Sequence, residues 1–193
     1  MLTAAVRDIQ RCYPKRFAIA VDTPFPALWD NNPHVSNLDA DDPEVECIDC
    51  HYPLIDRSVV EPVHFLQGFL TYLNEKLGIH ARLTRPSGDI YLSPKDKSSP
   101  SPVASFVDEA TPYWIIVAGG KYDFVQVGEA GDFHPPLNNV LDFRGKTQSL
   151  RNLVKLVYHA AGVLCPVTFL SHLSAAVETT HGGERPCVVV AGG

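Results

Sequence analysis

The sequence predicts an α/β protein built mainly on parallel sheets, and three observations lead to this fold class. Short apolar runs typical of strands alternate with segments of helical periodicity. Glycine and proline mark many of the junctions between them. The chain of 193 residues is 45% apolar and 20% charged, which suits a globular protein with a sizeable core in one large or two small domains.

The first half of the chain predicts two helices and three strands. An apolar stripe with helical spacing covers residues 2–13 and ends at Pro14. A second stripe runs from about residue 60 to Leu77, and Gly78 is its expected stop. The strands are short apolar runs over residues 17–21, 45–50 and 89–92.

A polar segment divides the chain into two predicted domains. Residues 93–102 are dominated by Ser, Pro, Lys and Asp, a composition typical of an exposed linker. We therefore predict an amino-terminal α/β domain over residues 1–93, a linker over 94–112 and a carboxy-terminal α/β domain over 113–193.

The second half predicts strands and helices in alternation, with one short link. Helices are expected over residues 149–160 and 169–177, and strands over 114–118, 124–127, 140–143, 163–165 and 187–190. Only the five residues from Gly119 to Asp123 separate the first two strands. That length suits an antiparallel hairpin, whereas parallel neighbours need a crossover of about a dozen residues or more. Two interpretations are open: a hairpin, or a crossover missing at the Asp123–Phe124 join.

Composition argues against several classes of protein. The net charge of −6 disfavours nucleic acid as a partner, because phosphate binding needs a basic surface. No apolar run approaches the roughly 18–20 residues that span a bilayer. The amino terminus lacks the features of a signal peptide, so the predicted location is cytoplasmic.

The cysteines suggest reduced thiols, with one local motif. Five cysteines are an odd number, scattered through apolar contexts. Cys47, Cys50 and His51 form C-x-x-C-H, the spacing that attaches haem in c-type cytochromes. The interpretations left open are a haem or metal site and, favoured here, cysteines at a strand end followed by a loop histidine.

The carboxy-terminal segment of the chain carries a family resemblance; it reads LVYHAAGVLCPVTFLSHLSAAVETTHGGERPCVVVAGG. This segment resembles glycosyltransferase family 9, the ADP-heptose:lipopolysaccharide heptosyltransferases and their relatives. His172-Leu173-Ser174-Ala175-Ala176 stands where that family carries H-L-A-A-A. The opening MLTAAVRDIQRCYP is similar to the family's first helix. WIIVAGGKYD and FVQVGEAGD look like two strands of its nucleotide-sugar domain, which the family separates by a helix.

The resemblance implies a GT-B architecture, in which two Rossmann-like domains bind acceptor and donor. Against that family the chain looks incomplete at both ends. The implied reaction is an inverting transfer of a heptose-like sugar from a nucleotide-diphosphate sugar, an ADP-sugar above all, to a glycan or lipopolysaccharide acceptor. It requires neither a metal nor another cofactor. Peripheral membrane contact and a homo-oligomer are partners that this setting allows.

The resemblance also implies four donor-binding residues. Thr168 and His172 fall on one face of the helix that follows the 163–165 strand, and its first N–H groups suit a diphosphate. Lys121 follows two glycines and suits phosphate oxygens, and Glu129 stands where the family places an acid on the ribose. For each, an ordinary structural role is the alternative: a helix cap, packing against the sheet, or a solvated side chain. Val167 and Phe169 replace the family's usual acidic and glycine residues.

No residue inherits the catalytic base. The family's catalytic aspartate precedes its first helix, and this chain begins after that point, so the chain as written is expected to lack the base. Asp22 is a cleft carboxylate without an assigned role. The alternatives to a transferase are a non-catalytic Rossmann-like module that binds a nucleotide or anion or associates with itself, and an electron-transfer or metal protein centred on Cys47.

Overall fold

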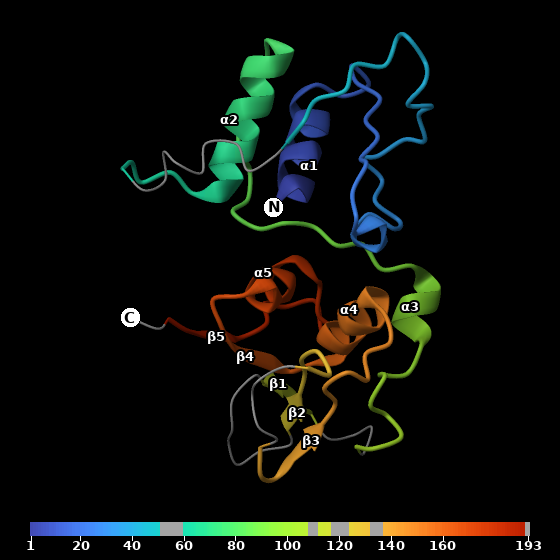
Figure 1. Cartoon of the computed structure of the whole chain (residues 1–193), viewed down its shortest axis with the longest axis vertical. Helices are drawn as coiled ribbons and strands as arrows, with labels where there is room; N and C mark the ends of the chain where they lie inside the picture. The colour runs from blue at the N-terminus through green and yellow to red at the C-terminus, as the bar shows by residue number, and fades with distance from the viewer. Residues whose placement is uncertain (51–59, 108–111, 117–123, 132–136, 192–193) are drawn as a thin grey trace. The chain divides into compact units, whose positions relative to one another are not determined.

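The computed structural model describes all residues except 51–59, 108–111, 117–123, 132–136 and 192–193 (Figure 1). The chain forms two compact units, Met1–Asp89 and Ile90–Gly193, which are described separately below.

The first unit is organised around two helices that lie side by side, α1 (Leu2–Cys12) and α2 (Phe65–Leu77) (Figure 1). A ring nitrogen of His64 accepts a hydrogen bond from the Leu66 amide at the start of α2. Gly78 ends α2 in the left-handed region, with φ 59°, as the sequence predicts. The core between the helices is apolar and contains Ala5, Ile9, Leu70, Leu73, Ile79 and Ala81. A short 3-10 helix, η1 (Pro26–Leu28), completes the described elements of this unit.

Two strands predicted for the first unit do not form. Residues 17–21 and 45–50 have no regular secondary structure, and the described part of this unit contains no strand. The apolar side chains of both runs nevertheless pack against the core, among them Phe17, Ile19, Ile48 and Cys50. Burial alone therefore accounts for their apolar pattern, because strand propensity mostly reports packing on a half-buried surface.

The second unit is an α/β fold on one parallel sheet, which confirms the predicted class (Figure 1). The strand order is β3-β2-β1-β4-β5 and every neighbouring pair is parallel. The strands are β1 (Trp114–Ile116), β2 (Phe124–Gln126), β3 (Val140–Asp142), β4 (Gly162–Pro166) and β5 (Cys187–Val190). The helices are α3 (Pro94–Ser98), α4 (Leu150–His159) and α5 (Phe169–Ala176).

The hairpin interpretation of the short link is wrong. β1 pairs with β2 in parallel, with Trp114 opposite Phe124 and Ile116 opposite Gln126. The residues that join the two strands, 117–123, lie outside the described part of the chain. The third strand predicted for the first half, over 89–92, is reduced to a single bridge between Ile90 and Val177.

The centre of the sheet is buried and closely packed. Ile115, Val125 and Val163 on three adjacent strands are fully buried, as are Val154, Leu156 and Val157 of α4. α4 and α5 lie next to each other over the sheet (Figure 1). Gly162 at the start of β4 lies against the Trp114 ring so closely that an added Cβ would meet ring atoms at 2.6 Å.

The segment predicted as an exposed linker belongs instead to the second unit. Ser93 and Asp96 form a reciprocal capping box at the start of α3. Asp96 also pairs with Arg151 of α4 at 2.6 Å, and Val103 is fully buried. The polar composition of this stretch thus serves a helix cap and an ion pair rather than solvation alone.

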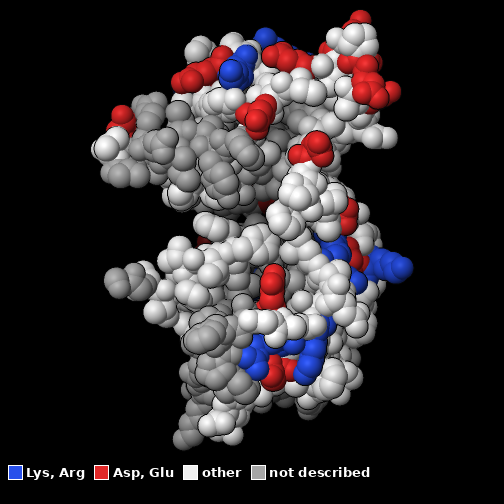
Figure 2. Space-filling view, viewed as in Figure 1, with Lys and Arg blue, Asp and Glu red and all other residues white. Residues whose placement is uncertain are grey.

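The surface of the first unit is acidic on one loop. Figure 2 shows acidic atoms gathered over the segment that carries Asp39, Asp41, Asp42, Glu44 and Glu46.

Among the described helices, each is too short or too polar to traverse a bilayer.

Candidate functional site

The strand order of the second unit has its switch point between β1 and β4. The chain passes from β1 to β2 on one side and reaches β4 on the other side of β1. In open parallel sheets the loops after two such strands diverge, and ligands bind outside their carboxyl ends at this switch point. We call the turn from β4 into α5, beside this switch point, the carboxyl-edge site.

The turn from β4 into α5 leaves the amino end of the helix without a side-chain cap. Thr168 is the N-cap residue, yet its hydroxyl donates back to the Pro166 carbonyl at 3.3 Å and makes no cap hydrogen bond. In α4, by contrast, Ser149 accepts a hydrogen bond from the Asn152 amide at 3.1 Å. The first N–H groups of a helix have no partner inside the helix. At α5 the Ser171 amide donates to the Thr168 carbonyl at 3.1 Å, so among the described residues the Phe169 and Leu170 amides are left for an anionic group, which the helix dipole also favours.

Two of the four residues predicted to bind the nucleotide-sugar donor lie at this turn. Thr168 and His172 are exposed and lie one helical turn apart on α5. Neither structural alternative is seen: the Thr168 hydroxyl does not cap the helix, and the exposed His172 is not buried against the sheet. Glu129 is exposed on the loop after β2, at the same edge of the sheet but two strands from β4. Lys121 lies outside the described residues.

Apolar and unreactive groups surround the α5 turn. Val167 and Phe169 are 67% and 47% exposed, so two apolar side chains flank the helix start. Cys165, just before the turn, is buried, and burial together with the neighbouring Cys187 raises the pKa of its thiol to about 11. A thiol with so high a pKa is protonated at neutral pH and is no nucleophile.

A charged turn after β3 was missed by the sequence reasoning. Arg144 donates two hydrogen bonds to the Asp142 carboxylate, each 2.9 Å long, and they lower the pKa of that carboxyl to about 2. The turn packs on the Glu129 loop, because the Gly145 amide donates to the Gly128 carbonyl at 2.8 Å. The motif Asp-Phe-Arg-Gly-Lys directly after a predicted strand was the available signal, since carboxyl ends of parallel strands share one edge.

The first unit contains a pocket of about 380 Å³ at the amino end of α1. Asp22 and Asp49 line it, together with three aromatic rings, those of Phe25, Trp29 and Phe69. The structure thus places Asp22 in a pocket wall, where the sequence could only name it as a carboxylate near a strand end. Carboxylates beside aromatic rings suit a ligand that has both hydroxyl groups and an apolar face.

The pocket offers little to a metal-site interpretation. Cys50 lines it, and burial and the charge of Asp49 raise the pKa of its thiol. Cys47 is exposed, and His51 lies outside the described residues. Within the described ranges no three His, Cys, Asp or Glu side chains gather closely enough to hold a metal ion.

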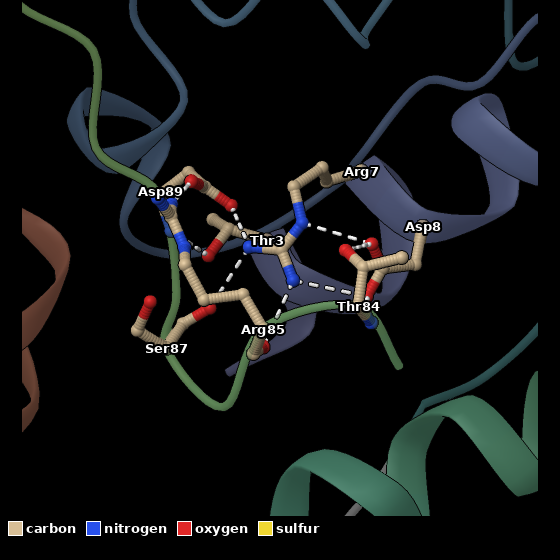
Figure 3. A network of polar contacts seen from close by, with 7 residues as sticks. All are labelled: Thr3, Arg7, Asp8, Thr84, Arg85, Ser87 and Asp89. Carbon is tan, nitrogen blue, oxygen red and sulfur yellow. Dashed lines mark hydrogen bonds and ion pairs between the residues drawn. The ribbon is translucent and has the colours of Figure 1, made fainter. Parts of the chain in front are cut away.

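A buried ion-pair network holds residues 84–89 against α1 (Figure 3). At its centre is Arg7, which is 4% exposed and whose five N–H groups all donate hydrogen bonds. Two reach the Asp8 carboxylate at 2.9 Å and a third reaches an oxygen of Asp89 at 2.5 Å. The other two reach backbone carbonyl oxygens at 3.0 Å, those of Arg85 and Ser87.

The carboxylates of this network have further donors. The Thr84 amide and hydroxyl donate to Asp8 at 3.0 and 2.6 Å, and Arg85 pairs with Asp89. Burial acts to raise the pKa of Asp8, but the hydrogen bonds from Arg7 and Thr84 outweigh it, and the pKa lies below its ordinary value. Because the buried charges and donors of this network all have partners, the network holds α1 in place. The start of α1 is also a wall of the pocket lined by Phe25, Trp29 and Phe69, which we call the aromatic pocket.

Comparison with solved structures finds a distant resemblance to a glycosyl transferase. No family model and no curated protein sequence matches this chain. The crystal structure of a glycosyl transferase family 9 protein from Veillonella parvula is similar, with a TM-score of 0.46 and 12% sequence identity. The match covers 68% of this chain and 50% of that one, so this chain spans about half the length of that protein in the match.

Proposed function

We propose that this chain is a glycosyltransferase that takes a sugar from a nucleotide-diphosphate donor and transfers it to a glycan or lipid-linked acceptor. The observation that carries the proposal is the uncapped amino end of α5 at the switch point between β1 and β4. The sequence of that same helix carries the resemblance to glycosyltransferase family 9. A diphosphate is the part of such a donor that a helix amino end binds.

The chemistry assigned to the carboxyl-edge site is stabilisation of the leaving group. An acceptor hydroxyl oxygen attacks the anomeric carbon while the bond from that carbon to the diphosphate oxygen breaks. Negative charge then grows on the diphosphate, and the α5 N–H groups and the Lys121 ammonium compensate it without a metal ion. Thr168 and His172 contact the phosphate oxygens, and Glu129 accepts hydrogen bonds from the ribose.

The acceptor side is assigned to the aromatic pocket of the first unit. Asp22 and Asp49 supply acceptor oxygens for sugar hydroxyls, and the rings of Phe25, Trp29 and Phe69 supply apolar faces. The general base stays unassigned, because a base must lie within hydrogen-bond reach of the attacking hydroxyl. A heptose-like sugar carried by ADP, a lipopolysaccharide acceptor and a cytoplasmic setting with peripheral membrane contact are the finer parts of the proposal.

Calorimetric titration of the folded chain with ADP tests the donor site. We expect saturable binding that His172→Ala weakens about tenfold, the usual effect of losing one hydrogen bond to a charged group. His80→Ala is the control, because His80 is an exposed histidine of the first unit that lines neither of the two pockets described in this chain. Absence of binding at millimolar ADP, or equal weakening by both variants, contradicts the proposal.

The alternative is a self-associating module, and the exposure of β5 favours it. β5 is an edge strand without a charged residue, and Val188, Val189 and Val190 are 50%, 44% and 56% exposed. Unprotected apolar edges pair with other strands, here the β5 of a second copy. Light scattering decides between the functions: a tight dimer that Val189→Lys dissociates, in a chain without ADP binding, supports the module.

A further inference from the structure

The second unit contains a large pocket at the opposite edge of the sheet from the carboxyl-edge site. Its volume is about 1000 Å³, and four segments line it. They are the stretch after α3, the residues before β1, the end of α4 before β4, and the connection from α5 to β5. Because the strands are parallel, the last three segments lie at the amino ends of β1, β4 and β5. We call this the amino-edge pocket.

Arg185 places a permanent positive charge in the wall of this pocket. Its guanidinium donates four hydrogen bonds, all to backbone carbonyl oxygens, those of Ala160, Ser174, Val177 and Glu178. One N–H of its five is left over. Within the described residues no carboxylate lies within ion-pair distance of Arg185, and burial lowers the pKa of the guanidinium without neutralising it.

Two histidines and several hydroxyl groups complete the wall. The Nε2 atom of His159 lies 3.0 Å from the Ser99 carbonyl oxygen and donates its proton there, and burial lowers the pKa of this imidazole. In the neutral ring Nδ1 is therefore an acceptor, which suits a hydroxyl group of a ligand. His181 is exposed in the same wall. Glu184 is the lining carboxylate, and the hydroxyl groups belong to Ser98, Ser99, Ser101, Thr179 and Thr180.

We infer that the amino-edge pocket binds a phosphorylated small molecule that carries hydroxyl groups. The remaining N–H of Arg185 and the exposed His181 imidazole suit a phosphate group, because charge-assisted hydrogen bonds are the strongest available to it, while Nδ1 of His159 suits a ligand hydroxyl. The volume exceeds that of phosphate alone, and the hydroxyl-rich wall suits a polyhydroxyl body.

Histidine resonances provide a readout that does not depend on the proposed transferase activity. Inorganic phosphate, and in a second titration a hexose phosphate, is added to the full chain at constant ionic strength. The imidazole signals of His159 and His181 are expected to shift and saturate, while His80 of the first unit does not follow. The hexose phosphate is expected to bind more tightly than phosphate, and equal affinity contradicts the assigned polyhydroxyl body.

Two substitutions are expected to change the affinity of the amino-edge pocket for phosphate in opposite directions. Glu184→Gln removes the carboxylate that repels a phosphate, and we expect it to tighten binding about threefold or more. His181→Ala removes a donor, and we expect it to weaken binding about tenfold. Both residues are exposed, so neither change is expected to disturb the fold.

A substitution at the other edge completes the design. His172→Ala leaves phosphorylated ligands in the amino-edge pocket unaffected, although it weakens ADP at the carboxyl-edge site. Non-saturating shifts of all histidines together, or an unchanged affinity in Glu184→Gln, overturn the inference. Because the two sites are read by different variants, failure here leaves the proposed donor site untouched.

Discussion

Replacing Asp8 by Asn removes the charge at the heart of the buried network of the first unit. Asp8 is fully buried and accepts four hydrogen bonds, two from Arg7 and two from Thr84. An asparagine has one acceptor oxygen, and its NH₂ group faces donors where the second carboxylate oxygen was. The Arg7 guanidinium then shares Asp89 with Arg85 and keeps a buried charge that is only partly compensated.

The expected loss of stability follows from the buried Arg7 charge, which Asp8→Asn leaves only partly paired. Removing one partner of a buried ion pair costs about 3–5 kcal/mol, and a small domain has only about 5–15 kcal/mol in total. We therefore expect Asp8→Asn to lower the free energy of unfolding of the first unit by about 3–5 kcal/mol. The double change Arg7→Met with Asp8→Leu is expected to cost less than Asp8→Asn, because no charge stays buried.

Urea denaturation followed by fluorescence measures this loss in the first unit alone. The chain has two tryptophans, Trp29 in the first unit and Trp114 in the second, so a Trp114→Phe background leaves Trp29 as the reporter. With a slope of about 1–3 kcal/mol per molar urea, the midpoint moves by more than about 1 M. Asp30→Asn on the exposed surface is the matched control. A loss below about 1 kcal/mol in Asp8→Asn refutes the assigned role of the network.

The pH dependence has a definite sign. The pKa of Asp8 is lower in the folded state, so its stabilisation is present above the ordinary carboxyl pKa and is lost as pH falls through the folded value. The difference between wild type and Asp8→Asn is therefore constant near neutral pH and shrinks below about pH 4. A difference that grows on acidification contradicts the pKa direction.

Three further predictions concern the second unit. Gly162→Ala is expected to cost about 1–3 kcal/mol in thermal or urea unfolding, because its Cβ would meet the Trp114 ring at 2.6 Å, and an unchanged midpoint would show that the ring moves freely. Cys165, whose thiol pKa is raised to about 11, is expected to resist iodoacetamide at pH 8 until the protein unfolds, while mass spectrometry finds alkylation at the exposed cysteines Cys12, Cys47 and Cys187. Arg144→Gln is expected to raise the pKa of Asp142 from about 2 towards its ordinary value in a carboxyl NMR titration, and no change would show that the pair does not form in solution.

Helices and the parallel sheet were predictable because their signals are local. The 3.6-residue stripe of α2 and its Gly78 stop follow from side-chain spacing and from the backbone freedom of glycine at φ 59°. Alternation of short apolar runs with helices predicted the sheet of the second unit. The same local signal failed at residues 17–21, where burial against α1 and α2 produces a strand-like pattern without a strand partner.

The candidate sites likewise include residues that local sequence patterns indicate and residues that they do not. The position of Thr168 and His172 was predictable, because a strand followed directly by a helix places the helix start at the carboxyl edge, while their donor-binding role stays a prediction. The Arg144–Asp142 pair and the amino-edge pocket were missed, although their residues are plain in the sequence. The pocket is lined by segments from residue 97 to residue 185, and no local pattern relates them.

By itself the sequence determined which segments are apolar on one face, where helices stop, and that the chain forms an α/β protein. Only the tertiary structure decided that β1 and β2 are parallel, that α3 joins the second unit, and that Arg7 is shared between Asp8 and Asp89. The physical reason is range. Periodicity and backbone preference act over a few residues. Strand pairing depends on contacts with other segments, such as Trp114 of β1 with Gly162 of β4, and the buried ion pair of Arg7 with Asp89 joins residues 82 positions apart.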